Sequence, residues 1–165
     1  MTPESAILRA VDPDHPRRQS FCGYCGHRPE AAPAAQDTRV CGECGLGLLL
    51  TADEGLAPAA GEAFLVVDPG LTIRALSQAA EELFALADTD LVDQPLENVV
   101  VPAESSDAAR SALGRLVAGV AHEPLSRREP DVAVLRPART FGIRYQARIG
   151  RCEPGRAALV VLSRL

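Results

Sequence analysis

Four cysteines in the N-terminal third of the chain are the residues best suited to chemistry. They form two C-x2-C pairs, Cys22 with Cys25 and Cys41 with Cys44, and fifteen residues separate the pairs. Two residues between cysteines let one tight turn present two thiolates to one ion. Two such turns supply the four corners of a tetrahedron, the geometry that Zn²⁺ accepts in structural sites. The spacing therefore predicts a metal centre that holds zinc.

A glycine follows each of these cysteines, and the four are Gly23, Gly26, Gly42 and Gly45. Glycine is expected to let the backbone adopt positive φ and direct N–H groups toward the sulfurs. The paired turns resemble the knuckles of a zinc ribbon and of rubredoxin, a protein that binds iron through four thiolates. Iron therefore remains an alternative to zinc, because ligand type alone does not separate the two metals.

Three other uses of these cysteines have less support. Disulfides are disfavoured because no signal peptide precedes the cysteines, and a reducing cytosol keeps thiols free. A thioredoxin-like redox pair would be expected near a βαβ pattern, which is lacking here. His27 could replace one sulfur, but a histidine that flanks four thiolates is expected at the surface.

Charge and hydropathy limit the partners. All 17 basic residues are arginine, the net charge is −5, and residues 1–55 carry five arginines against eight acidic residues. Nucleic-acid binding normally needs a basic surface that releases counterions, so the sequence disfavours it. A transcriptional regulator that uses the cysteine segment remains an alternative. No apolar run approaches the ~20 residues of a membrane span, and the sequence predicts a soluble cytoplasmic protein.

The composition changes along the chain and predicts two folded units. A unit of about 30 residues buries too little surface to fold unaided, so the metal must stabilise the ribbon. Leu46–Leu50 is expected to form a short strand at its end. The predicted division is an N-terminal tail at 1–20, with a helical turn at most around Ile7–Val11, a zinc ribbon at 21–50, a linker at 51–61, and a larger domain at 62–165.

The larger domain alternates strands and helices. A continuous apolar run predicts a buried strand at Ala63–Val67, and Ser77 is a suitable N-cap for the helix that follows. An apolar stripe with helical spacing begins after Ser106 and ends before Pro124, and it predicts a long helix. Further strands are expected at 71–75, 131–136, 141–149 and 157–162.

Three stretches of this domain resemble the PAS family. They are Phe64–Ile73 (FLVVDPGLTI), Ser77–Phe84 (SQAAEELF) and Leu91–Leu96 (LVDQPL). The sequence departs from the usual pattern at Ser77, where asparagine is typical, and at Ala85 and Asp93, where glycine is typical. The resemblance implies an α+β fold, with a five-stranded antiparallel sheet, helices on one face, and a ligand cavity or a plain core between them.

PAS domains sense small molecules, light or redox state, or mediate dimerisation, and they are not usually catalytic. The resemblance therefore implies a non-catalytic sensory, signalling or protein-interaction module that acts through a protein partner or a homodimer. A small-molecule ligand in the PAS core is a further candidate, and its identity is open. Arg144 and Arg148 share one predicted sheet face and are candidate partner contacts, although a solvated face is the default interpretation. His122, at the end of the long helix, is the only candidate haem ligand, and Cys152 is expected to be a small strand residue.

Overall fold

The computed structural model of the chain describes residues 17–30, 39–124 and 129–165. The predicted helical turn around Ile7–Val11 and most of the segment between the cysteine pairs lie outside these residues. The elements are β1 (Arg18–Cys22), β2 (Leu49–Asp53), β3 (Ala63–Val67), β4 (Ile73–Leu76), α1 (Gln78–Phe84), α2 (Asp88–Leu91), the 3₁₀ helix η1 (Leu96–Asn98), β5 (Val100–Pro102), α3 (Asp107–His122), β6 (Asp131–Pro137), β7 (Tyr145–Glu153) and β8 (Ala157–Arg164).

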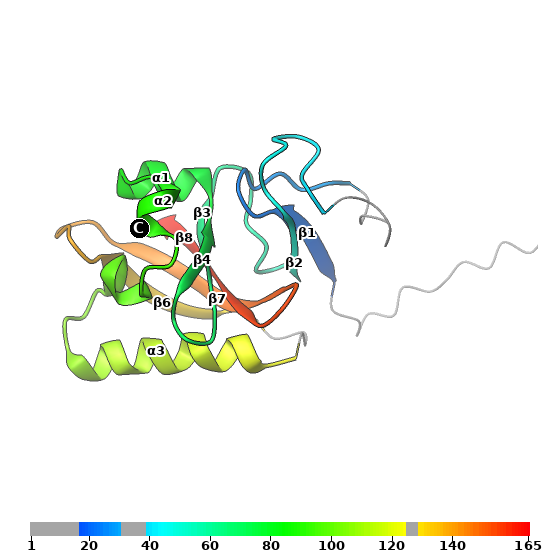
Figure 1. Cartoon of the computed structure of the whole chain (residues 1–165). Coiled ribbons are helices and arrows are strands. Elements are labelled where there is room, and N and C mark those ends of the chain that lie inside the picture. The colour runs from blue at the N-terminus through cyan, green and yellow to red at the C-terminus, as the bar shows by residue number, and fades with distance from the viewer. Residues whose placement is uncertain (1–16, 31–38, 125–128) are drawn as a thin grey trace, which may run out of the picture.

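The strands of the described residues form one antiparallel sheet of eight strands rather than the five expected (Figure 1). Its main order is β1-β2-β7-β8-β3-β4, while β6 pairs with β7 and β5 pairs with β6. Five of these strands, β3, β4, β6, β7 and β8, form the predicted sheet. Strand β5 joins it by pairing with β6, while β1 and β2 join it because β7 is long enough to pair with two neighbours along one edge. Residues Tyr145–Ile149 pair with β6, and Cys152–Glu153 pair with β2.

The cysteine-bearing segment is therefore continuous with the larger sheet. We call β1, β2 and the loops between them the N-terminal hairpin. β1 begins at Arg18, inside the predicted tail, and β2 extends to Asp53, inside the predicted linker. The strand predicted at Leu46–Leu50 begins only at Leu49. Leu46 and Leu48 are 74% and 56% exposed, because a turn closed by the bond from Cys41 N–H to the Gly47 carbonyl (2.7 Å) occupies the preceding residues.

The alternating pattern of 141–149 extends beyond the strand that it predicts. β7 begins at Tyr145, four residues after Phe141. Gly142 adopts a φ of 88°, and Phe141 is 78% exposed, with the Arg136 guanidinium 4.6 Å from the centre of its ring. A left-handed residue cannot continue a strand, so the first part of the pattern lies in a loop.

Serine side chains cap the two main helices, and the cap at Ser77 is the one that the sequence predicts. The Ser77 hydroxyl accepts a hydrogen bond from Ala80 N–H (3.2 Å), and Ser106 accepts one from Ala109 N–H (3.1 Å). Each bond satisfies one of the N–H groups that a helix start leaves without a partner. Ser77 also accepts a bond from Phe64 N–H (3.0 Å), so one buried hydroxyl ties β3 to the start of α1.

Ala85 and Asp93 both adopt the left-handed conformation that the usual glycine would favour. Their φ angles are 53° and 64°. Ala85 ends α1, and its N–H donates to the carbonyls of Glu81 and Glu82. An L-residue in this conformation carries a steric cost of about 1–2 kcal/mol, so the chain keeps these turns despite the substitutions.

Ala85→Gly is expected to stabilise the protein by about 1 kcal/mol, because glycine adopts the left-handed C-cap without a steric cost. Denaturant unfolding measures the change. Ala79→Gly, in the first turn of the same helix, is the control and should destabilise by about 0.5–1 kcal/mol. Equal losses in both variants would contradict the left-handed conformation at Ala85.

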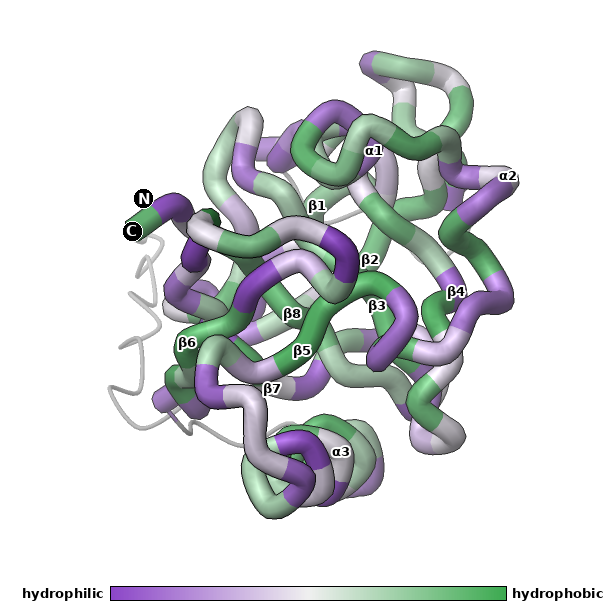
Figure 2. Tube along the Cα trace, turned by 90° about the vertical axis from the view of Figure 1, so that its left-hand side faces the viewer, coloured by the Kyte–Doolittle hydropathy of each residue, from purple (hydrophilic) through white to green (hydrophobic). Residues whose placement is uncertain are grey.

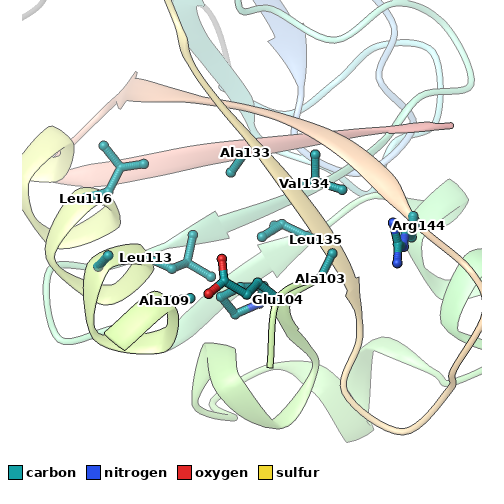
Figure 3. Close-up of a pocket in the computed structure, with 11 residues that line it drawn as sticks. Ala103, Glu104, Ala109, Leu113, Leu116, Ala133, Val134, Leu135 and Arg144 are labelled. Atoms are coloured by element: carbon teal, nitrogen blue, oxygen red, sulfur yellow. The ribbon is translucent and has the colours of Figure 1, made fainter. Parts of the chain in front are cut away.

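Helix α3 packs on the same core as α1 and α2, and it lies at the opposite end of the molecule from α1 (Figure 2). Four residues of its stripe are buried, namely Leu113, Val117, Val120 and Ala121. In the middle of the helix Leu116 is only half-buried and Ala112 is exposed. This part of α3 stands beside β5 and β6 and leaves a groove between them (Figure 3).

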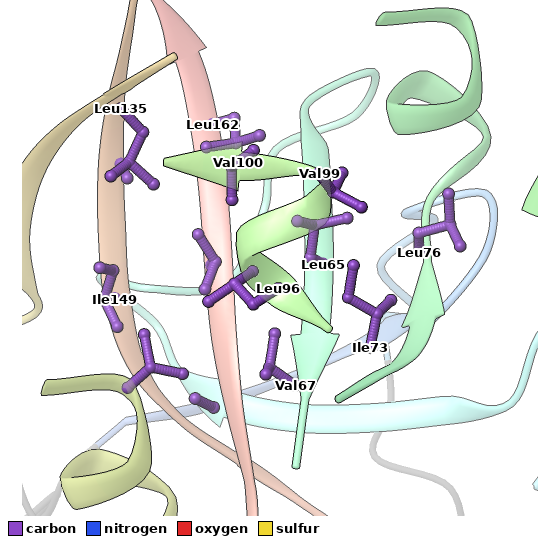
Figure 4. Close-up of a cluster of buried hydrophobic side chains, with 14 of the residues drawn as sticks. Leu65, Val67, Ile73, Leu76, Leu96, Val99, Val100, Leu135, Ile149 and Leu162 are labelled. Carbon is purple, nitrogen blue, oxygen red and sulfur yellow. The ribbon is translucent and has the colours of Figure 1, made fainter. Parts of the chain in front are cut away.

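The inner face of the sheet and the helices enclose the main core (Figure 4). Alternate residues of the strands point into it, among them Leu65 and Val67 of β3 and Ile149 of β7. Leu91 and Leu96, from α2 and η1, cover it together with α3. The structure therefore has a packed core in the space where a ligand cavity or a plain core was expected.

A second core lies on the outer face of the same strands. Phe64 and Val66 of β3 and Leu159 and Val161 of β8 are buried there against residues of the N-terminal hairpin and the segment that follows it. The hairpin contributes Phe21, whose ring meets the ring of Phe64 edge-to-face at 5.5 Å. Strands β3 and β8 are therefore covered on both faces, which explains why their sequences are continuously apolar.

Candidate metal centre

The four cysteine sulfurs converge on one point at the end of the N-terminal hairpin. All four lie within 4.8 Å of one another. The Sγ atoms of Cys22 and Cys44 are 3.6 Å apart, and those of Cys25 and Cys41 are 3.9 Å apart. A tetrahedral zinc ion with Zn–S bonds of about 2.3 Å holds its sulfurs roughly 3.8 Å apart. The predicted site residues are thus brought together with a spacing that suits a metal ion.

The two C-x2-C turns have matching backbones. We call residues 22–26 knuckle 1 and residues 41–45 knuckle 2. In each, the N–H of the final glycine donates to the carbonyl of the first cysteine, at 3.1 Å in knuckle 1 and 2.9 Å in knuckle 2. These glycines, Gly26 and Gly45, have φ of 72° and 68°. The two turns therefore present their sulfurs in the same way from opposite sides.

Gly23 and Gly42 do not adopt the positive φ that the sequence analysis expected of all four glycines. Glycine suits position 23 for a different reason, because a Cβ there would lie 3.1 Å from a methyl of Leu50. A Cβ on Gly42 would meet no atom within 4 Å. The positive φ belongs to the residue after the second cysteine of each pair, where the chain must turn away from the sulfurs.

Backbone N–H groups are directed at the sulfurs, although they come from other residues than the four glycines. Tyr24 and Cys25 N–H each lie 3.4 Å from Cys22 Sγ, and Gly47 N–H lies 3.4 Å from Cys44 Sγ. N–H···S bonds of this kind delocalise the negative charge of a thiolate cluster.

The surroundings of the sulfurs differ in their effect on ionisation. The N–H groups of Gly47 and Leu46 lower the pKa of the Cys44 thiol to about 6, so this sulfur is a thiolate at neutral pH. Burial raises the pKa of Cys25 to about 12, and it raises that of Cys22 too. A cation at the centre would hold all four as thiolates, as metal ligation requires.

Gly47 sets how closely the knuckles approach. A Cβ on this residue would lie 2.3 Å from Cys22 Sγ and 2.8 Å from Tyr24 Cβ. Gly47 is buried, and its carbonyl accepts the N–H of Cys41. The backbone of the second cysteine loop is therefore packed directly on the first ligand of knuckle 1.

Knuckle 1 is bonded to helix α1. The Tyr24 carbonyl accepts the N–H of Gln78 (2.8 Å), the first residue of α1, and the Tyr24 hydroxyl donates to Glu81 Oε2 (3.1 Å). Arg28 reaches in the other direction, and its Nε donates to the Pro58 carbonyl (2.8 Å). The cysteine cluster is thus tied to α1 on one side and to the segment after β2 on the other.

The other candidate residues occupy separate positions. Arg148 Nη2 pairs with Glu62 Oε2 (2.7 Å), and its Nη1 donates to the Gly55 carbonyl (2.9 Å), so it holds the segment after β2 against the sheet. Arg144 precedes β7. The His27 and His122 side chains are exposed. Cys152 is buried in the outer core, where burial raises the pKa of its thiol to about 12, as suits a small strand residue.

The groove between α3, β5 and β6 has a volume of about 690 Å³ (Figure 3). Apolar side chains line most of it, including Leu113, Leu116 and Leu135, while Glu104 and Arg144 stand at its margins. The Arg144 guanidinium has no hydrogen-bond or ion-pair partner within the part of the chain that the structure describes. No sequence signal pointed to this groove, because it arises where part of the apolar stripe of α3 is not covered by the neighbouring strands.

A curled antiparallel sheet with a long helix and short helices over its inner face is the arrangement that the resemblance implied. A family model described as the PAS fold matches residues 58–145. The chain belongs to this family. The match starts at Pro58, inside the predicted linker, and takes in β3 to β6. Sensory and signalling proteins are the setting in which PAS domains occur.

Solved PAS domains match the chain at low identity. A PAS domain of a Desulfitobacterium hafniense protein is 14% identical, with a TM-score of 0.48, and the match covers 65% of this chain and 95% of that one. The PAS domain of nitrogen regulation protein NR(II) from Vibrio parahaemolyticus is 20% identical, with a TM-score of 0.40 and coverage of 64% and 90%.

A third structure, the PAS domain of an HTR-like protein from Haloarcula marismortui, is 9% identical, with a TM-score of 0.42 and coverage of 63% and 81%. A comparison with curated proteins finds no match. Within the described residues of this PAS protein, no helix has both the length and the apolar character that crossing a bilayer requires.

Proposed function

We propose that this chain is a non-catalytic PAS sensory and protein-interaction module whose N-terminal hairpin is a ribbon built around a structural zinc ion. The observation that carries the proposal is the convergence of four sulfurs at the end of a hairpin whose strands continue the PAS sheet. Cys22, Cys25, Cys41 and Cys44 would be the ligands. Zinc would supply charge neutralisation and a rigid tetrahedral cross-link, with no redox chemistry of its own.

Zinc suits this hairpin better than iron or a nucleic-acid role does. Rubredoxin iron sites usually lie among aromatic rings, but the Phe21 ring packs on Phe64 in the outer core. The N-terminal 55 residues are acidic, and a site of four thiolates and Zn²⁺ adds about two further negative charges, which disfavours contact with phosphates. Free thiols also suit the cytoplasmic location that we propose for the module.

We propose that the module acts through a protein partner or a second copy of the chain. The N-terminal hairpin covers the outer core, so contacts would use the remaining surface. This surface includes exposed apolar side chains of β6 and of the following loop, Val132, Val134 and Phe141. These residues lie away from the outer core that the hairpin covers.

Native mass spectrometry combined with elemental analysis of the purified protein tests the proposal. The expected result is one zinc ion per chain. Two copies in one particle would identify the homodimer. A mass equal to the bare polypeptide would overturn the zinc centre, and a red protein that contains iron would replace zinc with the rubredoxin alternative. Chemical cross-linking in lysate tests the partner, and a strictly monomeric protein without cross-links would contradict the interaction role.

Small-molecule sensing is a second candidate function, and the α3–β6 groove favours it. Its volume of about 690 Å³ lies within the range of ligand sites, roughly 300–1,000 Å³. We propose that it accepts a largely apolar molecule whose anionic group pairs with Arg144. Leu116→Trp should fill the groove and abolish the extra mass that a retained ligand adds under native conditions. Retention of that mass in the variant would contradict the assignment.

A further inference from the structure

Tyr24 connects the sulfur cluster directly to the first turn of α1. Its N–H lies 3.4 Å from Cys22 Sγ, while its carbonyl accepts Gln78 N–H at 2.8 Å and its hydroxyl donates to Glu81 at 3.1 Å. Gln78 and Glu81 both belong to the first turn of α1. A movement of knuckle 1 therefore changes the contacts that hold a PAS helix in place.

The sulfurs are arranged so that one member of each close pair is accessible. Cys44 and Cys25 are half-buried, whereas Cys22 and Cys41 are 0% and 1% exposed. Each accessible sulfur has a buried neighbour within 4 Å on the opposite knuckle, since Cys44 lies 3.6 Å from Cys22 and Cys25 lies 3.9 Å from Cys41. An oxidant from solution thus meets an outer sulfur first and finds a second sulfur directly behind it.

We infer that the cysteine centre is an oxidation-sensitive input, in which a peroxide converts cross-knuckle sulfur pairs to disulfides, releases the metal and alters α1 through Tyr24. The inference rests on the metal centre proposed above. Exposure leaves Cys25 and Cys44 open to the first attack, and the shorter distance, 3.6 Å from Cys44 to Cys22, favours that pair. The reactive group belongs to the class of hydroperoxides, with hydrogen peroxide as the probe.

The chemistry balances in two steps. The Cys44 thiolate attacks one oxygen of hydrogen peroxide, the O–O bond breaks, and hydroxide leaves, which gives a sulfenic acid. The Cys22 thiolate then attacks that sulfur, the S–O bond breaks, and a second hydroxide leaves with the S–S bond formed. Two electrons pass from the sulfurs to the peroxide, and two protons from the buffer acid convert the hydroxides to water. The metal loses two anionic ligands and departs.

The rearrangement must reach Tyr24, because a disulfide brings two sulfurs to about 2.05 Å from the 3.6 Å seen here. Gly47 already packs against Cys22 with no room for further approach at that point. The inferred route is a shift of knuckle 1 that carries the Tyr24 carbonyl with it. Helix α1 then loses the acceptor of its first N–H group.

The test uses the full chain loaded with zinc. Hydrogen peroxide is added in increments, zinc release is followed with a chromogenic chelator, disulfides are mapped by peptide mass spectrometry, and α1 is followed by amide hydrogen exchange. We expect release of one zinc per chain, a Cys22–Cys44 disulfide, and exchange at residues 81–84 that is faster by up to about tenfold, the value of one lost hydrogen bond.

Two variants separate the parts of the inference. Cys152→Ala removes the buried cysteine outside the cluster and should respond as the unmodified protein does. Gln78→Pro removes the N–H that Tyr24 accepts, at a first helical position where proline is well tolerated. It should still release zinc, but the peroxide-induced change at residues 81–84 should shrink severalfold.

The outcomes distinguish this inference from the proposed function. A protein that contains no metal before peroxide is added contradicts the metal centre itself. Zinc that stays bound in excess peroxide contradicts only the oxidation-sensitive input, and so do disulfides confined within each knuckle. Zinc release with unchanged exchange in α1 contradicts the connection through Tyr24.

Discussion

Cys41→Ala is expected to abolish metal binding and to unfold both knuckles, while the main PAS core stays folded. Cys41 is 1% exposed, and its sulfur is one of four around a single point. Few side chains hold the loop that carries it, since Val40, Leu46 and Leu48 are all exposed. Structural zinc contributes about 10–16 kcal/mol apparent in small peptides, so the loop has no comparable source of stability.

Elemental analysis and amide hydrogen exchange measure the two parts of this effect. Zinc per chain should fall from one to zero, and exchange should rise through residues 22–28 and 39–48 but remain slow in β3 and β8. Cys152→Ala is the matched control, because it also removes a buried sulfur but lies outside the cluster. Slow exchange in the knuckles of Cys41→Ala would show that packing, and not metal, holds them.

Gly47→Ala is expected to weaken metal binding by about 100-fold, the equivalent of about 3 kcal/mol, although it changes no ligand. The new methyl would lie 2.3 Å from Cys22 Sγ and 2.9 Å from Tyr24 N. Both are parts of knuckle 1 that the metal and the backbone hold in place, so the two knuckles must separate. Competition with a chelator of known affinity measures the loss.

Gly42→Ala is the control for this substitution, since it adds the same methyl group to the same loop. No atom lies within 4 Å of its Cβ position, and its φ is not in the left-handed region. Its effect should stay within about 0.5 kcal/mol. Equal zinc affinities in the two variants would contradict the close contact between Gly47 and Cys22.

Local signals in the sequence carried much of the fold. Ser77 was predicted as a helix cap and is confirmed, because a cap depends only on the few residues around it. The start of the long helix after Ser106 is also confirmed. The spacing of the cysteines predicted that their sulfurs would gather, and the structure brings them together. The buried character of β3 was also read correctly from its apolar run.

Local signals of this kind could not predict which distant segments pair as strands. The bond pattern that joins Thr51–Ala52 to Cys152–Glu153 links residues about a hundred positions apart, and Thr51 and Asp53 lack the apolar alternation that marks a strand. The segment was therefore assigned to a linker. At Phe141 the opposite error arose, because alternation continued into a loop that Gly142 turns away from the sheet.

The role of Gly47 depends on a contact that no spacing rule encodes. Its nearest neighbours, Cys22 and Tyr24, come from the other cysteine pair, and only the folded hairpin places them against it. The same holds for Tyr24, whose partners on α1 are more than fifty residues away.

The sharing of β7 between β6 and β2 has a consequence for how the chain is made. A ribosome releases the cysteine segment well before β7, so Phe21 emerges without the surface that will cover it. A metal ion bound early would keep the nascent knuckles folded during that interval. The N-terminal hairpin would pair with the sheet only after the last strands have been synthesised. Zinc starvation should accordingly harm newly synthesised protein far more than protein that has already matured.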